Sequence, residues 1–330
     1  MMKRWAMVLV VLFAWLCVPV VGSQALAREK VLRAVVFVPL DSPMVAMTHE
    51  WVKRVNEALA GEVRVQYLGG PEVIPGFDQV EACRNGVVDI VFAAGSYYDP
   101  ILPEIIASLL SKVSLEEEMK PDGLYDYLVK SHETIGIRSL GRWLYNPFYL
   151  YFTKDVTGIE DLKGKKMRSG RTYDRMMQKM GMIPVTIGMP DVYTALERGT
   201  VDGFGWSMMG PLDFGWTEAA KHILDIPFYV TQNTLVLFNL SVWNGLSENA
   251  RNKILEIDKK FQHDVVEYFK GEIEKEWARL DKAGVKRIQF SSADREKFLS
   301  IAYDSAWEQL AEKLNDPDQV AKLKKITGND

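Results

Sequence analysis

Residues 161–170 read Asp-Leu-Lys-Gly-Lys-Lys-Met-Arg-Ser-Gly, and residues 191–206 read Asp-Val-Tyr-Thr-Ala-Leu-Glu-Arg-Gly-Thr-Val-Asp-Gly-Phe-Gly-Trp. The first stretch predicts a loop followed by a short strand that ends on Arg168. The second predicts a helix that stops at Gly199 and a strand that ends on Trp206. Ligands of open α/β sheets bind at the carboxyl ends of the strands, so Arg168 stands where such a sheet presents a positive charge to a ligand.

The N-terminal segment predicts export from the cytoplasm. A basic pair at residues 3–4 precedes an apolar run over residues 5–21, and Ala25-Leu-Ala27 offers small residues at a cleavage site. The apolar run is short for a membrane span, which needs about 20 residues. We therefore expect residues 1–27 to be a signal peptide that is cleaved after Ala27, which places the rest of the chain in the periplasm.

The charge balance, cysteine content and length of the chain limit its possible partners, disulfides and number of domains. The 330 residues include 40 basic and 44 acidic side chains, and the predicted signal peptide carries two of the basic ones, which leaves 38 against 44. This acidic balance argues against nucleic acid as a partner. After cleavage Cys83 is the only cysteine, so we expect no intramolecular disulfide. About 300 remaining residues suit two domains better than one.

Strands and helices alternate in the first part of the chain. Strands are predicted over residues 31–38, 63–67 and 87–92, with helices over 44–60 and 77–84 between them. A β-α-β-α-β order implies a parallel sheet with right-handed crossovers. Two helix ends have similar sequences, Gly86-Val-Val-Asp89 and Gly199-Thr-Val-Asp202. Each has glycine at the left-handed C-cap position and then begins a strand. This similarity suggests two α/β lobes that face a cleft.

Helices dominate the last part of the chain. Ser247 is expected to cap a helix that continues to about Ala283 and is long enough to cross both lobes. Two terminal helices are predicted over residues 292–314 and 317–326. In the middle, we predict a mostly helical segment over 101–130. Further strands are predicted over 134–140, 149–152 and 234–243.

These elements predict an α/β fold with two lobes that face a cleft and a long helix that spans both lobes. We assign residues 28–150 and 234–270 to lobe I. Residues 151–233 and 271–330 form lobe II, which carries Arg168.

The candidate ligand contacts gather beside predicted strand ends. A guanidinium group pairs two-pronged with a carboxylate, and Arg168 is followed by Ser169-Gly170 with no bulky cover. The other candidates are Ser96, Tyr97, Phe148, Tyr149, Ser169, Asp191, Tyr193, Trp206, Met209 and Phe214. Asp191 also suits a helix cap, and Tyr193 also suits core packing. The helical stripe Tyr173, Met176, Met177 and Met180 is assigned to the core.

Motifs for catalysis or for metal binding are missing from the sequence. The four histidines lack metal-ligand spacing, and no P-loop, dinucleotide fingerprint or nucleophile elbow is found. We therefore expect a binding protein without catalytic residues, metal or cofactor.

The chain resembles the periplasmic substrate-binding proteins of TRAP (tripartite ATP-independent periplasmic) transporters, the DctP-type family. The resemblance covers nearly the whole chain after the signal peptide. Its landmarks, in order, are Glu81–Asp89, Asp161–Arg168, Pro184-Val185, Val192–Leu196 and Gly199–Gly203. It implies two lobes joined by a hinge, a long helix across both, and a ligand closed between them. It also implies that Arg168 pairs with the ligand's carboxylate, and that the partner is a membrane permease driven by an ion gradient.

Several positions depart from relatives within that family. Many members carry Glu where this chain has Asp191. The sialic-acid-like branch has Asn near the position of Trp206 and a second arginine near that of Phe148. Gly205 stands where the keto-acid-like branch often has a Glu that helps to bind a metal. These differences suggest a small monocarboxylate with an apolar, aromatic or indole-like body, held by Arg168 at one end and stacked on Trp206 at the other.

Two alternatives to transport stay open. A sensor subunit that works with a membrane kinase would use the same fold, and an enzyme acting on a carboxylic acid would need an acid/base pair in the cleft. We expect a monomer that binds a carboxylate and delivers it to the permease.

Overall fold

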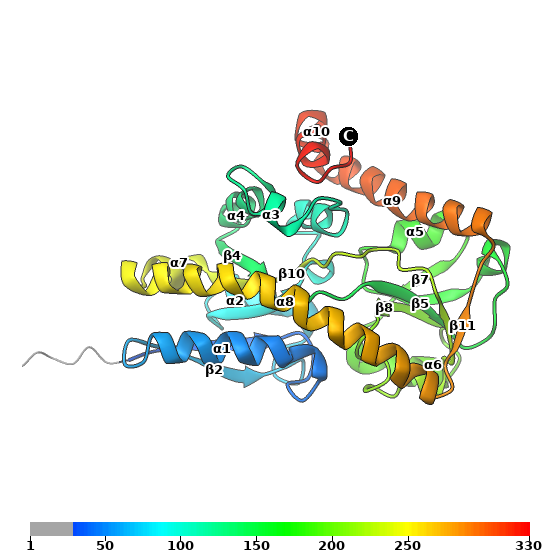
Figure 1. Ribbon diagram of the computed structural model, residues 1–330, viewed down its shortest axis with the longest axis horizontal. Coiled ribbons are helices and arrows are strands. Elements are labelled where there is room, and N and C mark those ends of the chain that lie inside the picture. The colour runs from blue at the N-terminus through cyan, green and yellow to red at the C-terminus, as the bar shows by residue number, and fades with distance from the viewer. Residues whose placement is uncertain (1–28) are drawn as a thin grey trace, which may run out of the picture.

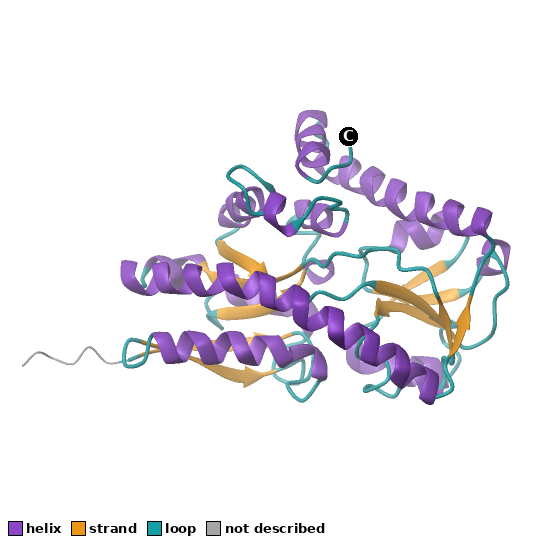
Figure 2. Ribbon diagram, viewed as in Figure 1, coloured by secondary structure: helices purple, strands orange, loops and turns teal. Residues whose placement is uncertain are grey.

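A computed structural model describes residues 29–330, which form two β-sheets on either side of a hinge (Figures 1 and 2). The predicted signal peptide and its cleavage site lie outside the described residues. The first sheet has the strand order β2-β1-β3-β10-β4, and the second has the order β11-β9-β5-β8-β6-β7. The predicted two-lobed α/β fold is confirmed.

The first sheet grows from the predicted β-α-β-α-β segment. Its strands are β1 (Lys30–Val36), β2 (Val63–Gly69), β3 (Ile90–Ala94), β4 (Ile137–Arg142) and β10 (Thr234–Asn239). Strand β1 pairs in parallel with β2 and β3, as predicted, whereas β10 is antiparallel to both of its neighbours. The helices of this lobe are α1 (Ala46–Ala58), α2 (Gln79–Arg84), α3 (Leu115–Glu118), α4 (Leu124–Thr134) and α7 (Leu240–Asn244).

The second sheet carries the segment that contains Arg168. Its strands are β5 (Phe148–Phe152), β6 (Lys166–Ser169), β7 (Ile183–Thr186), β8 (Gly203–Ser207), β9 (His222–Leu224) and β11 (Lys286–Ile288). Strand β6 runs parallel to β7 and β8, with the short helices α5 (Asp174–Lys179) and α6 (Val192–Glu197) as connections. Gly86 and Gly199, the predicted helix stops, have φ angles of 74° and 66°. Both are in the left-handed region that favours glycine.

Helix α8 (Glu248–Lys282) crosses both lobes as one continuous element (Figure 1). The Ser247 hydroxyl caps it by accepting from the Ala250 amide at 2.9 Å. Helices α9 (Ser292–Leu314) and α10 (Pro317–Ile326) have the bounds that were predicted. Capping residues define these ends locally, which is why the sequence alone locates them well.

Other predicted elements needed correction. The strand predicted over 234–243 ends at Asn239, because the Asn239 side chain accepts from the Val242 amide at 2.9 Å and starts α7. The strand predicted over 134–140 begins only at Ile137, since Thr134 still belongs to α4. The helical segment predicted over 101–130 is broken into a 3₁₀ stretch (Pro103–Leu109) and the helices α3 and α4. Strands β7, β9 and β11 were not predicted.

The strands also bear on the proposed lobe boundaries. Strand β5 begins at Phe148, two residues before the boundary predicted at residue 150, and pairs with β8 and β9 of the second sheet. Helix α9 packs on α5 of the second lobe and on the 3₁₀ stretch Pro103–Leu109 of the first. The boundaries at 150, 233 and 270 stay a prediction.

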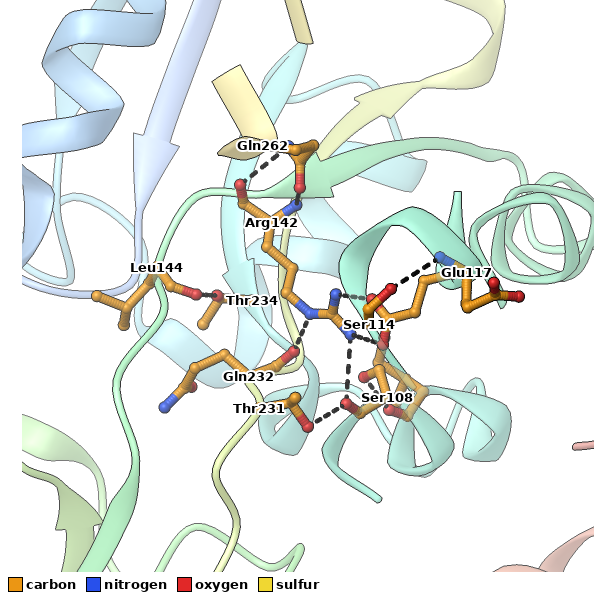
Figure 3. A network of polar contacts seen from close by, with 11 residues as sticks. Ser108, Ser114, Glu117, Arg142, Leu144, Thr231, Gln232, Thr234 and Gln262 are labelled. Carbon is orange, nitrogen blue, oxygen red and sulfur yellow. Dashed lines mark hydrogen bonds and ion pairs between the residues drawn. The ribbon is translucent and has the colours of Figure 1, made fainter. Parts of the chain in front are cut away.

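The chain passes between the lobes at residues 143–147 between β4 and β5, at residues 225–233 between β9 and β10, and along α8. Arg142 at the end of β4 bonds to two of these segments (Figure 3). Its Nε donates to the Gln232 carbonyl at 2.6 Å. Its backbone N–H and C=O bind the Gln262 side chain on α8 at 2.8 and 3.1 Å.

A carboxylate completes this arrangement. The Arg142 guanidinium pairs with Glu118 at the end of α3, and the two side chains are only 11% and 5% exposed. The Thr234 hydroxyl donates to the Leu144 carbonyl at 3.1 Å and joins two connecting segments directly. We call Arg142, Glu118, Gln232, Thr234 and Gln262 the hinge cluster. A Cβ atom on Gly141 would overlap the Gln262 amide, so a larger residue there would displace this amide from its bonds to Arg142.

Helix α8 also buries a carboxyl group against β4. Asp258 accepts from the Gly141 amide at 2.9 Å and from the Tyr125 hydroxyl at 3.3 Å. Burial disfavours the charged form and raises the pKa of Asp258 to about 6, although both hydrogen bonds oppose the rise.

Asp258→Asn is expected to remove part of the pH dependence of stability. The folded protein holds the Asp258 proton more tightly than the unfolded chain, so this carboxyl stabilises the fold at low pH. That contribution is lost as pH rises from about 4 to about 6. Relative to the variant, the wild type should lose up to about 3 kcal/mol of unfolding free energy between pH 4 and 7. Urea unfolding of both proteins at several pH values measures this, and a constant difference would contradict it.

Candidate functional site

A small cavity surrounds Arg168 at the carboxyl end of β6. Both lobes line it, with Phe37, Met44, Ala94, Ser96, Tyr97, Leu144, Gln232 and Thr234 from the first lobe and the hinge, and Phe148, Arg168, Gly170, Tyr173, Trp206 and Ser207 from the second. Its volume is about 20 Å³, room for about one water molecule. We call it the inner cavity.

The Arg168 side chain is fixed by the second lobe. It is 1% exposed, and its Nε donates to the Ile187 carbonyl at 3.0 Å. Nη1 lies 3.3 Å from the Gly205 carbonyl oxygen. The guanidinium carbon lies 4.9 Å from the centroid of the Trp206 ring, a cation–π contact. The other terminal nitrogen, Nη2, has no hydrogen-bond partner among the described residues.

This leaves a buried positive charge without a counter-ion. Among residues 29–330, no carboxylate lies within ion-pair distance of Arg168. A buried charge is costly unless it is paired, and carbonyl and aromatic contacts offset only part of that cost. An anionic group in the inner cavity would complete the pairing, and a carboxylate fits the guanidinium fork best.

Two further donors line the same cavity. The Tyr97 hydroxyl and the Trp206 Nε1 are buried and have no partner among the described residues. Burial raises the pKa of Tyr97, so its phenol stays protonated and able to donate at neutral pH, even though Arg168 acts in the opposite direction. The inner cavity thus offers several N–H and O–H donors to one small acceptor.

Gly205 allows Tyr173 to approach Arg168. The Tyr173 hydroxyl donates to the Gly205 carbonyl at 2.5 Å, and burial raises the pKa of Tyr173 to about 12. A Cβ atom at Gly205 would lie 2.6 Å from the Tyr173 ring. A glutamate there, as in the keto-acid-like branch, would need this tyrosine to move. Within residues 29–330, no group of three or more His, Cys, Asp or Glu side chains is placed to hold a metal ion.

The structure brings five of the predicted contact residues together. Ser96, Tyr97, Phe148, Arg168 and Trp206 all line the inner cavity. The role expected for Trp206 changes, because one face of its ring is covered by the Arg168 guanidinium. Trp206 therefore holds the arginine through that face, while its buried N–H has no partner among the described residues.

The remaining predicted contacts lie elsewhere. The Ser169 hydroxyl donates to Asp174, and the Tyr149 ring packs edge-on against Trp277 at 5.6 Å. The Tyr193 hydroxyl donates to Glu197 at 3.0 Å. None of these three lines the inner cavity.

Phe214 and Met209 do not line the inner cavity either. Phe214 packs on Trp206 with ring centroids 6.2 Å apart, and Met209 is buried in the core. Asp191 lines a second cavity instead of the first.

Sequence reasoning missed several lining residues. Phe37 follows β1, and its position after a strand in a parallel sheet was a usable signal. Tyr173 was assigned to the core because its helical stripe is apolar. Thr234 begins β10 and Gln232 lies two residues before it, and only the crossing between lobes brings these polar residues to the cavity.

The second cavity, which we call the outer chamber, adjoins the first. Its volume is about 350 Å³, and it shares Phe37 and Tyr97 with the inner cavity. Its other lining residues are Pro71, Pro75, Gly76 and Phe77 of the first lobe and Gly188, Met189, Pro190 and Asp191 of the second. Both cavities therefore lie between the lobes.

Two α/β lobes that enclose a buried, unpaired arginine define a two-lobed binding protein for an anionic solute. The family model of DctP, described as bacterial extracellular solute-binding protein, family 7, matches residues 35–314. The chain belongs to this family, and the predicted resemblance to TRAP periplasmic solute-binding proteins is confirmed.

Characterised relatives have low identity to the chain. A monocarboxylate 2-oxoacid-binding periplasmic protein of Nostoc sp. is 25% identical over 212 residues, which cover 59% of this chain and 56% of the relative. The match thus spans little more than half the length of that protein. A C4-dicarboxylate-binding periplasmic protein of Rhodobacter capsulatus is 22% identical and covers 92% of both chains.

Solved structures show the same fold. A TRAP periplasmic solute-binding protein of Desulfovibrio salexigens with bound orotic acid has a TM-score of 0.82 at 19% identity, covering 91% of this chain and 98% of its own. A Bordetella pertussis extracytoplasmic solute receptor binding pyroglutamic acid has a TM-score of 0.80 at 17% identity, covering 91% and 100%. At these identities the likeness concerns the fold.

Family membership has direct consequences for function. The family consists of periplasmic solute-binding receptors, so the expectation of a binding protein rather than an enzyme is confirmed, as is a role in transport. Over residues 29–330, no helix has the length and apolar character needed to span a membrane.

Proposed function

We propose that this protein binds a small organic monocarboxylate between its lobes and delivers it to the membrane permease of a TRAP transporter. The observation that carries the proposal is the Arg168 guanidinium, which is 1% exposed, lacks an ion pair among the described residues and has an unpartnered Nη2. A carboxylate would accept from Nη2 and from the nearby Tyr97 hydroxyl. Lobe closure excludes water and strengthens this pairing.

The relatives' ligands support a carboxylate. Solved neighbours carry orotic acid, pyroglutamic acid, D-glucuronate and β-D-galacturonate, and each of these ligands contains one carboxyl group. The Nostoc relative is described as binding monocarboxylate 2-oxoacids. Aromatic side chains at Phe37 and Tyr97, which line both cavities, favour a ligand whose body is apolar or aromatic, including an indole-like one.

We also propose where the protein is located and which partner it has. We expect a monomer in the periplasm, released from its signal peptide after Ala27, with a TRAP permease as its partner. Ligand binding alone would serve a sensor subunit of a membrane kinase equally well. Uptake of labelled ligand by vesicles that contain the permease distinguishes transport from sensing, because a sensor would give none.

A thermal-shift screen tests the ligand class. The purified protein is heated with aromatic monocarboxylates, short aliphatic monocarboxylates and C4-dicarboxylates at equal concentrations. A ligand at about 100 times its dissociation constant stabilises the fold by about 2.7 kcal/mol, which gives a clear rise in melting temperature. Stabilisation by aromatic monocarboxylates is expected. A rise with dicarboxylates alone would contradict the proposal.

A further inference from the structure

We infer that the outer chamber holds the body of the ligand, and that Asp191 within it selects against ligands with a second anionic group. The inference rests on the proposed function, in which Arg168 holds the carboxylate. It assigns the rest of the molecule to a part of the cleft that the sequence had not singled out as a pocket.

The two cavities differ greatly in volume. The inner cavity has about 20 Å³, whereas the outer chamber has about 350 Å³, within the range of about 300–1,000 Å³ typical of small-molecule sites. A carboxyl group beside Arg168 therefore leaves no room for an organic body in the same cavity. The two spaces share Phe37 and Tyr97 in their linings, so we place a body attached to that carboxyl group beside these rings.

The walls of the chamber suit an apolar body. The Phe77 ring lies against Tyr97 with centroids 4.4 Å apart, and Pro71 and Pro75 extend this wall. A Cβ atom on Gly76 would lie 2.6 Å from the Tyr97 ring, so glycine lets this loop rest on the tyrosine. Met189 and Pro190 form the wall from the other lobe, and the chamber is complete only when both lobes face each other.

The charge of the outer chamber indicates which ligands it disfavours. Among the described residues, Asp191 is the only Asp, Glu, Lys, Arg or His that lines the chamber. Within residues 29–330, no lysine, arginine or histidine lies within ion-pair distance of it. Arg171 is nearby, but its guanidinium lies over the Phe77 ring at 4.3 Å and is not part of the lining. A second carboxylate on the ligand would therefore meet like charge, which disfavours binding.

Gly188 offers a way to fill the chamber without disturbing the fold. Its φ of −61° and ψ of 152° are open to any residue, and a Cβ atom there would meet only Pro190 Cδ at 3.8 Å and Asp191 Oδ2 at 4.0 Å. Gly188→Phe should place a ring in the chamber, and Gly188→Ala is the matched control. Thermal melting without ligand verifies that both variants fold.

Calorimetry with propionate and 3-phenylpropionate tests the location of the body. Gly188→Phe is expected to weaken 3-phenylpropionate at least tenfold while propionate changes less than twofold, and Gly188→Ala should change neither. Equal affinities of the wild type and Gly188→Phe for 3-phenylpropionate would overturn the location.

A second pair of probes tests the charge. Asp191→Asn should improve binding of 3-(4-carboxyphenyl)propionate relative to 3-phenylpropionate by about three- to tenfold. An unchanged ratio would overturn the selectivity. Arg168→Ala separates these failures from failure of the proposed function. If Arg168→Ala leaves the affinity for every acid unchanged, Arg168 does not hold the carboxylate and the proposed function is wrong. If Arg168→Ala abolishes binding while Gly188→Phe leaves the affinity for 3-phenylpropionate unchanged, only the location of the body is wrong.

Discussion

Arg168→Ala is expected to abolish carboxylate binding, raising the dissociation constant at least about a hundredfold. The guanidinium supplies charge-assisted hydrogen bonds, each worth about 1.5–3 kcal/mol, inside a site that excludes water. Isothermal titration of wild type and variant with the best acid from the thermal-shift screen measures the loss. An unchanged affinity would show that Arg168 does not contact the ligand.

The stability of this variant is informative in its own right. Because Arg168 has no ion pair among the described residues, its removal should leave the ligand-free protein at least as stable as the wild type. Loss of binding then cannot be attributed to unfolding.

Arg168→Lys is the matched control for charge. A lysine keeps one positive charge but cannot reproduce the bonds to the Ile187 and Gly205 carbonyls or the flat contact with Trp206. Binding about tenfold or more weaker than wild type is expected, with some affinity retained. If lysine fully replaces arginine, the site needs only a positive charge, and the fixed position of Nη2 does not contribute to affinity.

Glu118→Ala is expected to destabilise the protein by about 3–5 kcal/mol. The substitution leaves the Arg142 guanidinium without its carboxylate at a site where the two side chains are 11% and 5% exposed. The free energy of unfolding from urea titration measures the effect. A loss below about 1 kcal/mol would mean that water or neighbouring carbonyls compensate Arg142 fully.

Two controls define the origin of that effect. Glu118→Gln keeps the size and an acceptor for Arg142, so it should cost clearly less than alanine. Glu256→Ala breaks the ion pair with Lys260 on the exposed face of α8, where both side chains are more than half exposed, and should leave the unfolding midpoint unchanged. Equal effects of the alanine variants at 118 and 256 would contradict a special role for the hinge cluster.

Local signals predicted the parts of the fold that depend on neighbouring residues. Strand β6, with Arg168 one residue before its end, was located from the glycine-containing loop that precedes it, and helices α9 and α10 follow from their caps. Short edge strands could not be found in this way. Strand β11, for example, pairs Lys286 with His222, a partner distant in sequence, and its residues carry no periodic pattern.

The site was predicted in part for a similar reason. Arg168, Trp206 and Phe148 end or begin strands, which sequence periodicity can place. Gln232 reaches the cavity because its segment crosses between lobes and its carbonyl is held by Arg142, 90 residues away along the chain. Tyr173 is buried whether it faces the core or the cavity, so its apolar stripe could not distinguish the two.

The hinge cluster bears on how this protein can acquire new ligands. Gln232 and Thr234 line the inner cavity and also hold the connecting segments together, so a mutation there alters recognition and lobe movement at once. Residues 188–191 line the outer chamber and have no bond to Arg142. Divergence of ligand preference should therefore accumulate at 188–191, while selection keeps 232 and 234 fixed across proteins that bind different acids.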